Sequence, residues 1–105
     1  MLTNDISGFD WDKGNCDKCQ KHGVSIQEIE SLFESSIAVF PDIAHSAREK
    51  RFIAIGKTAK VRYVFMVFTL RDSEHGKLIR PISARYMHDK EVKYYEKTLA
   101  NTKNG

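Results

Sequence analysis

The sequence predicts an α+β fold, in which a mostly antiparallel sheet packs against two N-terminal helices and one C-terminal helix. First, residues 1–105 suffice for a single domain with one core, because 41% of the residues are hydrophobic. Second, strand patterns separated by short polar turns crowd the middle of the chain, as in an antiparallel meander. Third, helical patterns stand near both ends. The expected order is β-α-α-β-β-β-β-α, with the helices on one face of the sheet.

The N-terminal part is expected to contain a short strand and a polar helix. Residues 1–7 lack a pattern and are expected to be flexible, whereas residues 9–11 are expected to form a strand. Asp12 can cap a helix over residues 13–22. Gly23 is a natural stop after the last turn of this helix.

The second helix has the clearest start signal in the chain. Ser25 and Glu28 have the spacing of a capping box, in which each side chain bonds to the backbone of the other residue. The apolar positions that follow have helical spacing and predict one buried stripe: Ile26, Ile29, Leu32 and Phe33. This helix is expected to end near Ser35 or Ser36.

Four further strands are expected over residues 37–40, 51–55, 62–70 and 77–86, with loops or turns over 42–50, 56–60 and 72–76. Residues 62–70 are apolar on both faces, as in a central strand. Pro81 cannot donate a hydrogen bond to a sheet ladder, so it marks an edge or a bulge.

The last strand and the helix after it could hold polar groups rigidly over the sheet. Regular alternation would place Leu78, Ile82 and Ala84 on one face, and Ser83 and Arg85 on the other. A helix is expected from Asp89 to about Leu99, and residues 100–105 are expected to be flexible.

Charge and hydropathy favour a cytoplasmic protein without membrane association. The net charge of +3 and the pI of about 8.9 permit RNA binding but do not require it. The longest apolar run, residues 63–68, is too short to span a bilayer. The N-terminus has neither the basic nor the apolar region of a signal peptide.

The spacing of Cys16, Cys19 and His22 raises the alternative of a zinc-binding protein. On one helix these three side chains would spread over about 120°, which is awkward for a shared metal ion. There is no second cysteine pair, and no βαβ pattern of the kind that precedes a redox cysteine pair. We therefore expect neither a metal site nor a cofactor.

Four segments, in this order, resemble the BrnT family of ribonuclease toxins of type II toxin–antitoxin systems: Phe9–Asp12 with Gly14 and Asn15, Lys21–Val24, Arg51–Ile53 with Ile55 and Gly56, and Ile82–Arg85 with Glu91, Tyr95 and Glu96. The resemblance covers residues 9–97 and departs at Pro81, where the family usually has an aliphatic residue. It implies a RelE-like fold and RNA cleavage that stops translation without a metal ion. It also implies a BrnA-like antitoxin with a ribbon-helix-helix part, and a homodimer or a toxin–antitoxin heterotetramer.

RNA cleavage without a metal needs a base, an acid and cations beside the phosphate. The candidate catalytic residues are His22, His45, Arg51 and Arg85. Each has a structural alternative. His22 can cap the end of a helix, and His45 can belong to a loop turn beside Asp42, within a D-x-x-H-S pattern that ends at Ser46. Arg51 can pair with Glu49 or Asp42, and Arg85 with Glu91 or Glu96.

The candidate substrate-binding residues are Lys21, Arg80, Ser83, Tyr86 and Tyr95. Lysine and arginine would bind phosphate, Ser83 would donate a hydrogen bond to it, and Tyr86 or Tyr94 would stack on a base. Tyr95 can equally be a core residue with its hydroxyl at the edge. A non-catalytic RNA- or protein-binding module on the same fold is the alternative function, because fold does not fix function.

Overall fold

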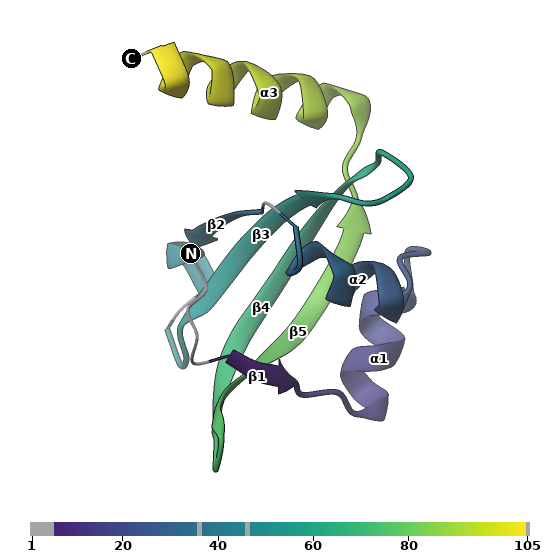
Figure 1. The fold of residues 1–105 in the computed structure, drawn as a ribbon, viewed down its shortest axis with the longest axis vertical. Coiled ribbons are helices and arrows are strands. Elements are labelled where there is room, and N and C mark those ends of the chain that lie inside the picture. Colours follow the sequence, from purple (N-terminus) through teal and green to yellow (C-terminus); the bar gives the residue numbers. More distant parts are fainter. Residues whose placement is uncertain (1–5, 36, 46, 105) are drawn as a thin grey trace.

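The structure is a computed structural model that describes residues 6–35, 37–45 and 47–104, the last four by their backbone alone. Within these residues it contains β1 (Ile6–Phe9), α1 (Lys13–Gln20), α2 (Ile26–Leu32), β2 (Ala38–Pro41), η1 (Ile43–His45), β3 (Arg51–Lys57), β4 (Tyr63–Ser73), β5 (Gly76–Tyr86) and α3 (Asp89–Asn104). The strands form one sheet in the order β1-β5-β4-β3-β2 (Figure 1).

The prediction of an α+β fold is confirmed. Only β1 pairs in parallel, with β5, and the three other strand pairs are antiparallel. Two helices precede the main strands and one follows them. None of the helices in the described part of the chain combines the length and the apolar character needed to cross a lipid bilayer.

The core lies between the sheet and the pair α1 and α2, which lie beside each other against it (Figure 1). Phe33 joins the layers, since its ring makes edge contacts with Phe9 and Phe68 at centroid distances of 5.6 and 5.4 Å. Gly56 lets the end of α2 approach β3 closely, because a Cβ atom there would lie 2.7 Å from Ile37 and 3.1 Å from Leu32. The fully buried apolar residues include Cys19, Val24, Ile29, Leu32, Ala54, Val64, Met66 and Phe68.

Both predicted helix caps are present. The Asp12 side chain accepts a hydrogen bond from the Asn15 backbone, and Ser25 does the same for Glu28. The Asn15 side chain in turn accepts a hydrogen bond from the Asp12 N–H at 2.7 Å, so the start of α1 has a complete capping box. These caps fix where α1 and α2 begin, and hence the position of the turn between them.

The bulge predicted at Pro81 is present, although β5 is an internal strand. The pairing of β4 with β5 slips by one residue, so that Val67 lies opposite Ser83 whereas Phe68 lies opposite Pro81. The slip corrects the predicted faces of the strand. Leu78 and Ala84 do not share a face, because their partners on β4, Arg71 and Met66, are five residues apart.

Several predicted element ends are wrong, mostly because backbone pairing continues beyond the apolar pattern. β3 runs through Gly56 to Lys57, and β4 and β5 are paired as far as Ser73 and Gly76, where turns were expected. β1 lies at residues 6–9, two of them in the segment expected to be flexible, because it pairs with β5. α1 ends at Gln20, and α3 continues past Leu99 to Asn104. Residues 1–5, Ser36, Ser46 and Gly105, named in the predictions above, lie outside the described residues.

The prediction that all helices gather on one face is also wrong. α1 and α2 cover the inner face of the sheet, whereas α3 crosses one end of it (Figure 1) and contacts the opposite side. We call that opposite side the outer face. It carries Ile53, Phe65, Val67, Ser83 and Arg85, which alternate with buried inner-face residues along β3, β4 and β5.

Candidate functional site

The outer face gathers Arg51, Ser83 and Arg85, three of the residues singled out from the sequence. Ser83 lies opposite Val67, and Arg85 lies opposite Phe65 on the neighbouring strand. Arg51 lies opposite Thr69, four residues further along β4 than Phe65. At about 3.3 Å per residue the two arginines are offset by roughly 13 Å along the strand direction, and β4 lies between their strands, so they stand at different parts of the outer face.

Arg85 is held by Glu91, the first of the two acidic partners that the sequence left open. Two guanidinium nitrogens of Arg85 donate to the two carboxylate oxygens of Glu91 at 2.7 and 2.8 Å. The guanidinium also lies over the ring of Phe65, 4.8 Å from its centroid. The hydrogen bonds from Arg85 and from the His88 backbone lower the pKa of Glu91 to about 2. A guanidinium has five N–H donors, so Arg85 retains donors for an anionic ligand.

His45 and Arg51 line one surface cavity of about 550 Å³, together with residues of the segment between η1 and β3. The Nδ1 atom of His45 lies 3.1 Å from a carboxylate oxygen of Asp42, whose side chain is only 11% exposed. When Nδ1 carries a proton and donates it to Asp42, Nε2 can accept a proton. A carboxylate that orients a histidine beside an arginine is an arrangement suited to acid–base chemistry on a phosphate.

Arg80 is engaged with two carboxylates. Its guanidinium nitrogens lie 2.8 Å from Asp12 and 3.4 Å from Asp10, and its side chain is 23% exposed. The pairs join β5 to the segment between β1 and α1. Arg80 and Arg51 line a neighbouring cavity of about 390 Å³. The structure thus gives Arg80 a structural role and places it at the margin of the site.

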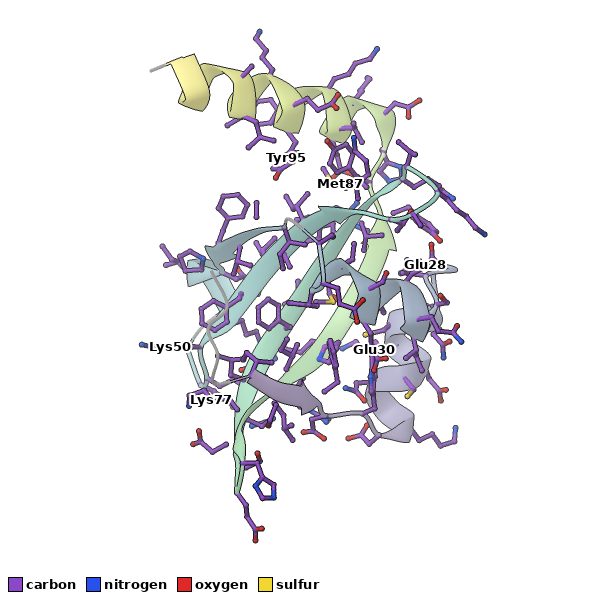
Figure 2. All side chains as sticks on the ribbon, in the orientation of Figure 1. Glu28, Glu30, Lys50, Lys77, Met87 and Tyr95 are labelled. Atoms are coloured by element: carbon purple, nitrogen blue, oxygen red, sulfur yellow. The ribbon has the colours of Figure 1, made fainter. Side chains whose placement is uncertain are left out.

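Tyr95 points from α3 towards the sheet (Figure 2). Its ring makes an edge contact with Tyr63 at a centroid distance of 5.7 Å. Together with Ile55, Phe65 and Met87 it lines an apolar cavity of about 440 Å³ between α3 and the outer face. Burial, and secondarily Tyr63, raises the pKa of Tyr95, which opposes a role as a base.

Lys21, His22 and Tyr86 lie apart from these residues. Tyr86 lies opposite the buried Val64, so its side chain is on the inner-face side of β5. Lys21 and His22 are exposed in the turn after α1, and the carbonyl of the next residue, Gly23, lies 3.5 Å from the Tyr86 hydroxyl. The structure therefore does not bring His22 together with Arg51 and Arg85 on one face.

Arg62 was not among the candidate residues predicted from the sequence. Its guanidinium carbon lies 3.6 Å from the centroid of the Tyr86 ring. The available signal was the end of β3 and the turn after it, residues 57–62, which contain three basic residues and no acidic one. Sequence reasoning also missed the hydrogen bond from the Trp11 indole to Glu30, 3.0 Å long, which joins the start of α1 to α2. A contact between residues so far apart in the chain has no local signal.

The two cysteines differ in environment. Cys19 is completely buried in the core, and Cys16 is half-buried beside it. Burial, and secondarily the neighbouring Cys16, raises the pKa of the Cys19 thiol to about 11. A thiol that resists ionisation is a poor metal ligand, so Cys19 acts here as a small apolar core residue. Among the residues that the structure describes, no group of three histidine, cysteine or acidic side chains is arranged to bind a metal ion.

The chain matches a known protein family. A family model described as Ribonuclease toxin, BrnT, of type II toxin-antitoxin system matches residues 11–91. No curated protein matches the chain significantly. The matched range includes His45, Arg51 and Arg85 and ends at Glu91, the partner of Arg85.

Proposed function

Because the chain belongs to the BrnT family of ribonuclease toxins of type II toxin–antitoxin systems, we propose that it cleaves RNA on the outer face of its sheet without a metal ion. The cleavage stops translation in the cytoplasm, and a BrnA-like antitoxin neutralises it. The observation that supports this proposal most strongly is the cavity in which Asp42 orients His45 beside Arg51. It combines a proton-transfer group, its positioning partner and a phosphate-binding cation.

In this mechanism the scissile phosphate lies at His45 and Arg51. Nε2 of His45 takes the proton of the RNA 2′-hydroxyl as the 2′-oxygen forms a bond to phosphorus. The bond from phosphorus to the 5′-oxygen breaks, and the 5′-oxygen takes a proton from solvent or from an acid of the enzyme. The products are a 2′,3′-cyclic phosphate and a 5′-hydroxyl. Arg51 stabilises the negative charge that develops on the phosphate oxygens.

Arg85 and Ser83 bind a second phosphate of the same strand. The offset of about 13 Å between Arg51 and Arg85 along the strand direction fits binding of successive parts of one RNA chain. Glu91 holds the Arg85 guanidinium in a fixed orientation at 2.7 Å. The role of Arg85 is therefore in substrate affinity, whereas His45 and Arg51 act in the chemical step.

The experiment is a gel assay of RNA cleavage in EDTA. Wild-type protein is expected to cleave in the chelator, and His45→Ala or Arg51→Ala is expected to lower the rate about 10²- to 10⁴-fold. Arg85→Ala is expected to raise KM more than it lowers kcat. Lys93→Ala, which removes an exposed cation from α3, is the matched control and should retain wild-type rates. Circular dichroism establishes that each variant is folded.

Loss of activity in EDTA would contradict cleavage without a metal. Full activity of His45→Ala with loss in His22→Ala would move the chemistry to the turn after α1. Absence of cleavage by wild type, on free RNA and on translating ribosomes, would favour the non-catalytic binding module. Repeating the cleavage assay with a co-expressed BrnA-like antitoxin tests whether the antitoxin neutralises the cleavage. Adding the protein to a translation extract tests whether it inhibits translation.

A further inference from the structure

The turn between β3 and β4 is basic and fixed in shape. Residues 57–62 include Lys57, Lys60 and Arg62 and no acidic residue. Val61 is 70% exposed and has φ 62°, the one positive φ at a residue other than glycine in the described part of the chain. For a β-branched residue this conformation is strained, and strain persists only where the surrounding structure imposes it.

Thr58 imposes that conformation. This residue is only 6% exposed, and its N–H donates to the Arg62 carbonyl at 2.8 Å. Its carbonyl accepts from the Val61 N–H at 2.9 Å, and its hydroxyl accepts from the Arg62 N–H at 3.3 Å. The turn is therefore preorganised, and the side chain of Arg62 starts from a defined position.

Arg62 is stacked on Tyr86. Its guanidinium carbon lies 3.6 Å from the ring centroid, and the side chain is exposed to solvent. The Tyr86 hydroxyl donates to the two carboxylate oxygens of Glu28 at 2.8 and 3.0 Å. Glu28 is fixed in turn by the N–H of Ser25 at 3.1 Å. One face of the Arg62 guanidinium thus lies on the Tyr86 ring, and its other face points away from the ring.

The turn that contains Lys21 and His22 reaches the same place. The Tyr86 hydroxyl lies 3.5 Å from the carbonyl oxygen of Gly23. Burial raises the pKa of Glu28, but hydrogen bonds from Ser25 and Tyr86 lower it by more. The positive charge of Lys60 also lowers this pKa, so Lys60 lies near Glu28. Two turns far apart in the sequence therefore meet around Tyr86, and the turn after α1 contributes the exposed Lys21 and His22 next to Gly23.

We propose that Arg62, stacked on Tyr86, is a platform on which an unpaired base of the RNA substrate stacks, while Lys21 and Lys60 contact the adjoining phosphates. The proposal rests on the proposed function and adds a second part to its substrate site. Arg85 and Tyr86 are consecutive on β5 and point to opposite faces at the same end of the sheet. That end of the sheet is the one that α3 crosses, so an RNA strand that contacts both Arg85 and Arg62 would run beside the start of α3.

The chemistry of the surface favours single-stranded RNA. Any base can stack on the flat face of a guanidinium, provided that the base is not already stacked in a duplex. The cations of the turn favour a polyanion. The ligand class is thus an unpaired segment of RNA, and Arg62 is a substrate-binding residue outside the catalytic cavity.

The test measures binding of a labelled single-stranded RNA whose riboses are all 2′-O-methylated, so that the protein cannot cleave it. Arg62→Ala is expected to weaken binding about 5- to 100-fold, which corresponds to the loss of one stacked base. Arg62→Lys is expected to keep the salt dependence of binding and to lose most of the affinity. Lys93→Ala is the matched cation control. Replacing single bases by abasic sites should weaken wild-type binding most at one position, and Arg62→Lys should be insensitive there.

Wild-type affinity in Arg62→Lys, or equal abasic profiles in the two proteins, would overturn stacking on Arg62. Unchanged RNA binding by Arg62→Ala with loss of antitoxin binding would make this surface a protein interface instead. Binding is measured without cleavage, so a wild-type protein that binds but does not cut natural RNA would contradict the proposed catalysis alone. A wild-type protein that does not bind RNA would overturn both proposals.

Discussion

Asn15 shows how one side chain joins three parts of the fold. It is 6% exposed, and its amide nitrogen donates to the Asp10 carbonyl at 3.0 Å and to the Pro81 carbonyl at 2.9 Å. The Pro81 carbonyl lies at the bulge of β5, where the pairing with β4 slips by one residue. The motif around Asn15 is therefore explained by structure and needs no catalytic role.

Asn15→Ala is expected to lower the free energy of unfolding by about 1–3 kcal/mol, because it leaves buried backbone groups without partners. Urea unfolding measures the loss. Gln20→Ala, which removes an exposed amide on the same helix with one weak bond of 3.3 Å to Cys16, should change stability by less than about 0.5 kcal/mol. Equal effects of the two substitutions would contradict this role of Asn15.

Residue types in the sequence predicted the candidate site only in part. Ser83 and Arg85 share the outer face because side chains alternate along one strand, whereas Arg51 joins them through the register of β3 and β5 on β4. The pairing of His45 with Asp42 is also local, since the two are three residues apart. His22 and Arg85 were grouped on chemistry alone. Only the packing of α1 against β5 decides that they do not meet, and no spacing in the sequence contains that information.

At the level of elements, hydrogen-bonding side chains were better guides than the lengths of apolar patterns. The caps at Asp12 and Ser25 were predicted because each needs only residues three apart. The ends of β3, β4 and β5 were not, because a polar residue stays in a strand when its backbone finds a partner on the neighbouring strand. The same slip in pairing at Pro81 reversed the predicted face of Leu78.

Gly56 tests the contact between α2 and β3. Gly56→Ala places a Cβ atom 2.7 Å from Ile37 and 3.1 Å from Leu32, so it is expected to destabilise the fold by about 1–3 kcal/mol. Ile37→Ala in the same protein should relieve the crowding. The double variant should therefore lose less stability than the sum of the two single variants, as measured by urea unfolding. Simple additivity would show that the crowding does not exist.

At the level of the whole molecule, the place of α3 is what the sequence could not predict. Its apolar positions, Val92, Tyr95 and Leu99, show that one side of the helix is less polar, but not which face of the sheet it meets. Polar contacts determine which face of the sheet α3 meets. Glu91 binds Arg85, and Glu96 accepts a hydrogen bond from the Tyr63 hydroxyl at 3.3 Å. α3 is thus attached near its N-terminus while Leu99 remains 37% exposed.

This attachment predicts that Glu91→Gln loosens α3 selectively. Hydrogen exchange at neutral pH should become faster in the first turns of α3, while β4 exchanges as in wild type, because few other contacts hold the helix. Asp89→Asn is the matched control, since it removes the same charge from the same helical turn without touching Arg85. Equal acceleration by both substitutions would mean that the charge at the helix N-terminus matters, and not the pair with Arg85.

The pH dependence of the pair has a definite sign. Arg85 lowers the pKa of Glu91 from an ordinary value of 4.5 to about 2 in the folded protein. The stability that Glu91 contributes is therefore fully present above pH 4.5 and is lost as the pH falls towards 2. The difference in unfolding free energy between wild type and Glu91→Gln should be constant from pH 7 to pH 5 and should shrink below that. A difference that grows on acidification would contradict the ion pair as the attachment of α3.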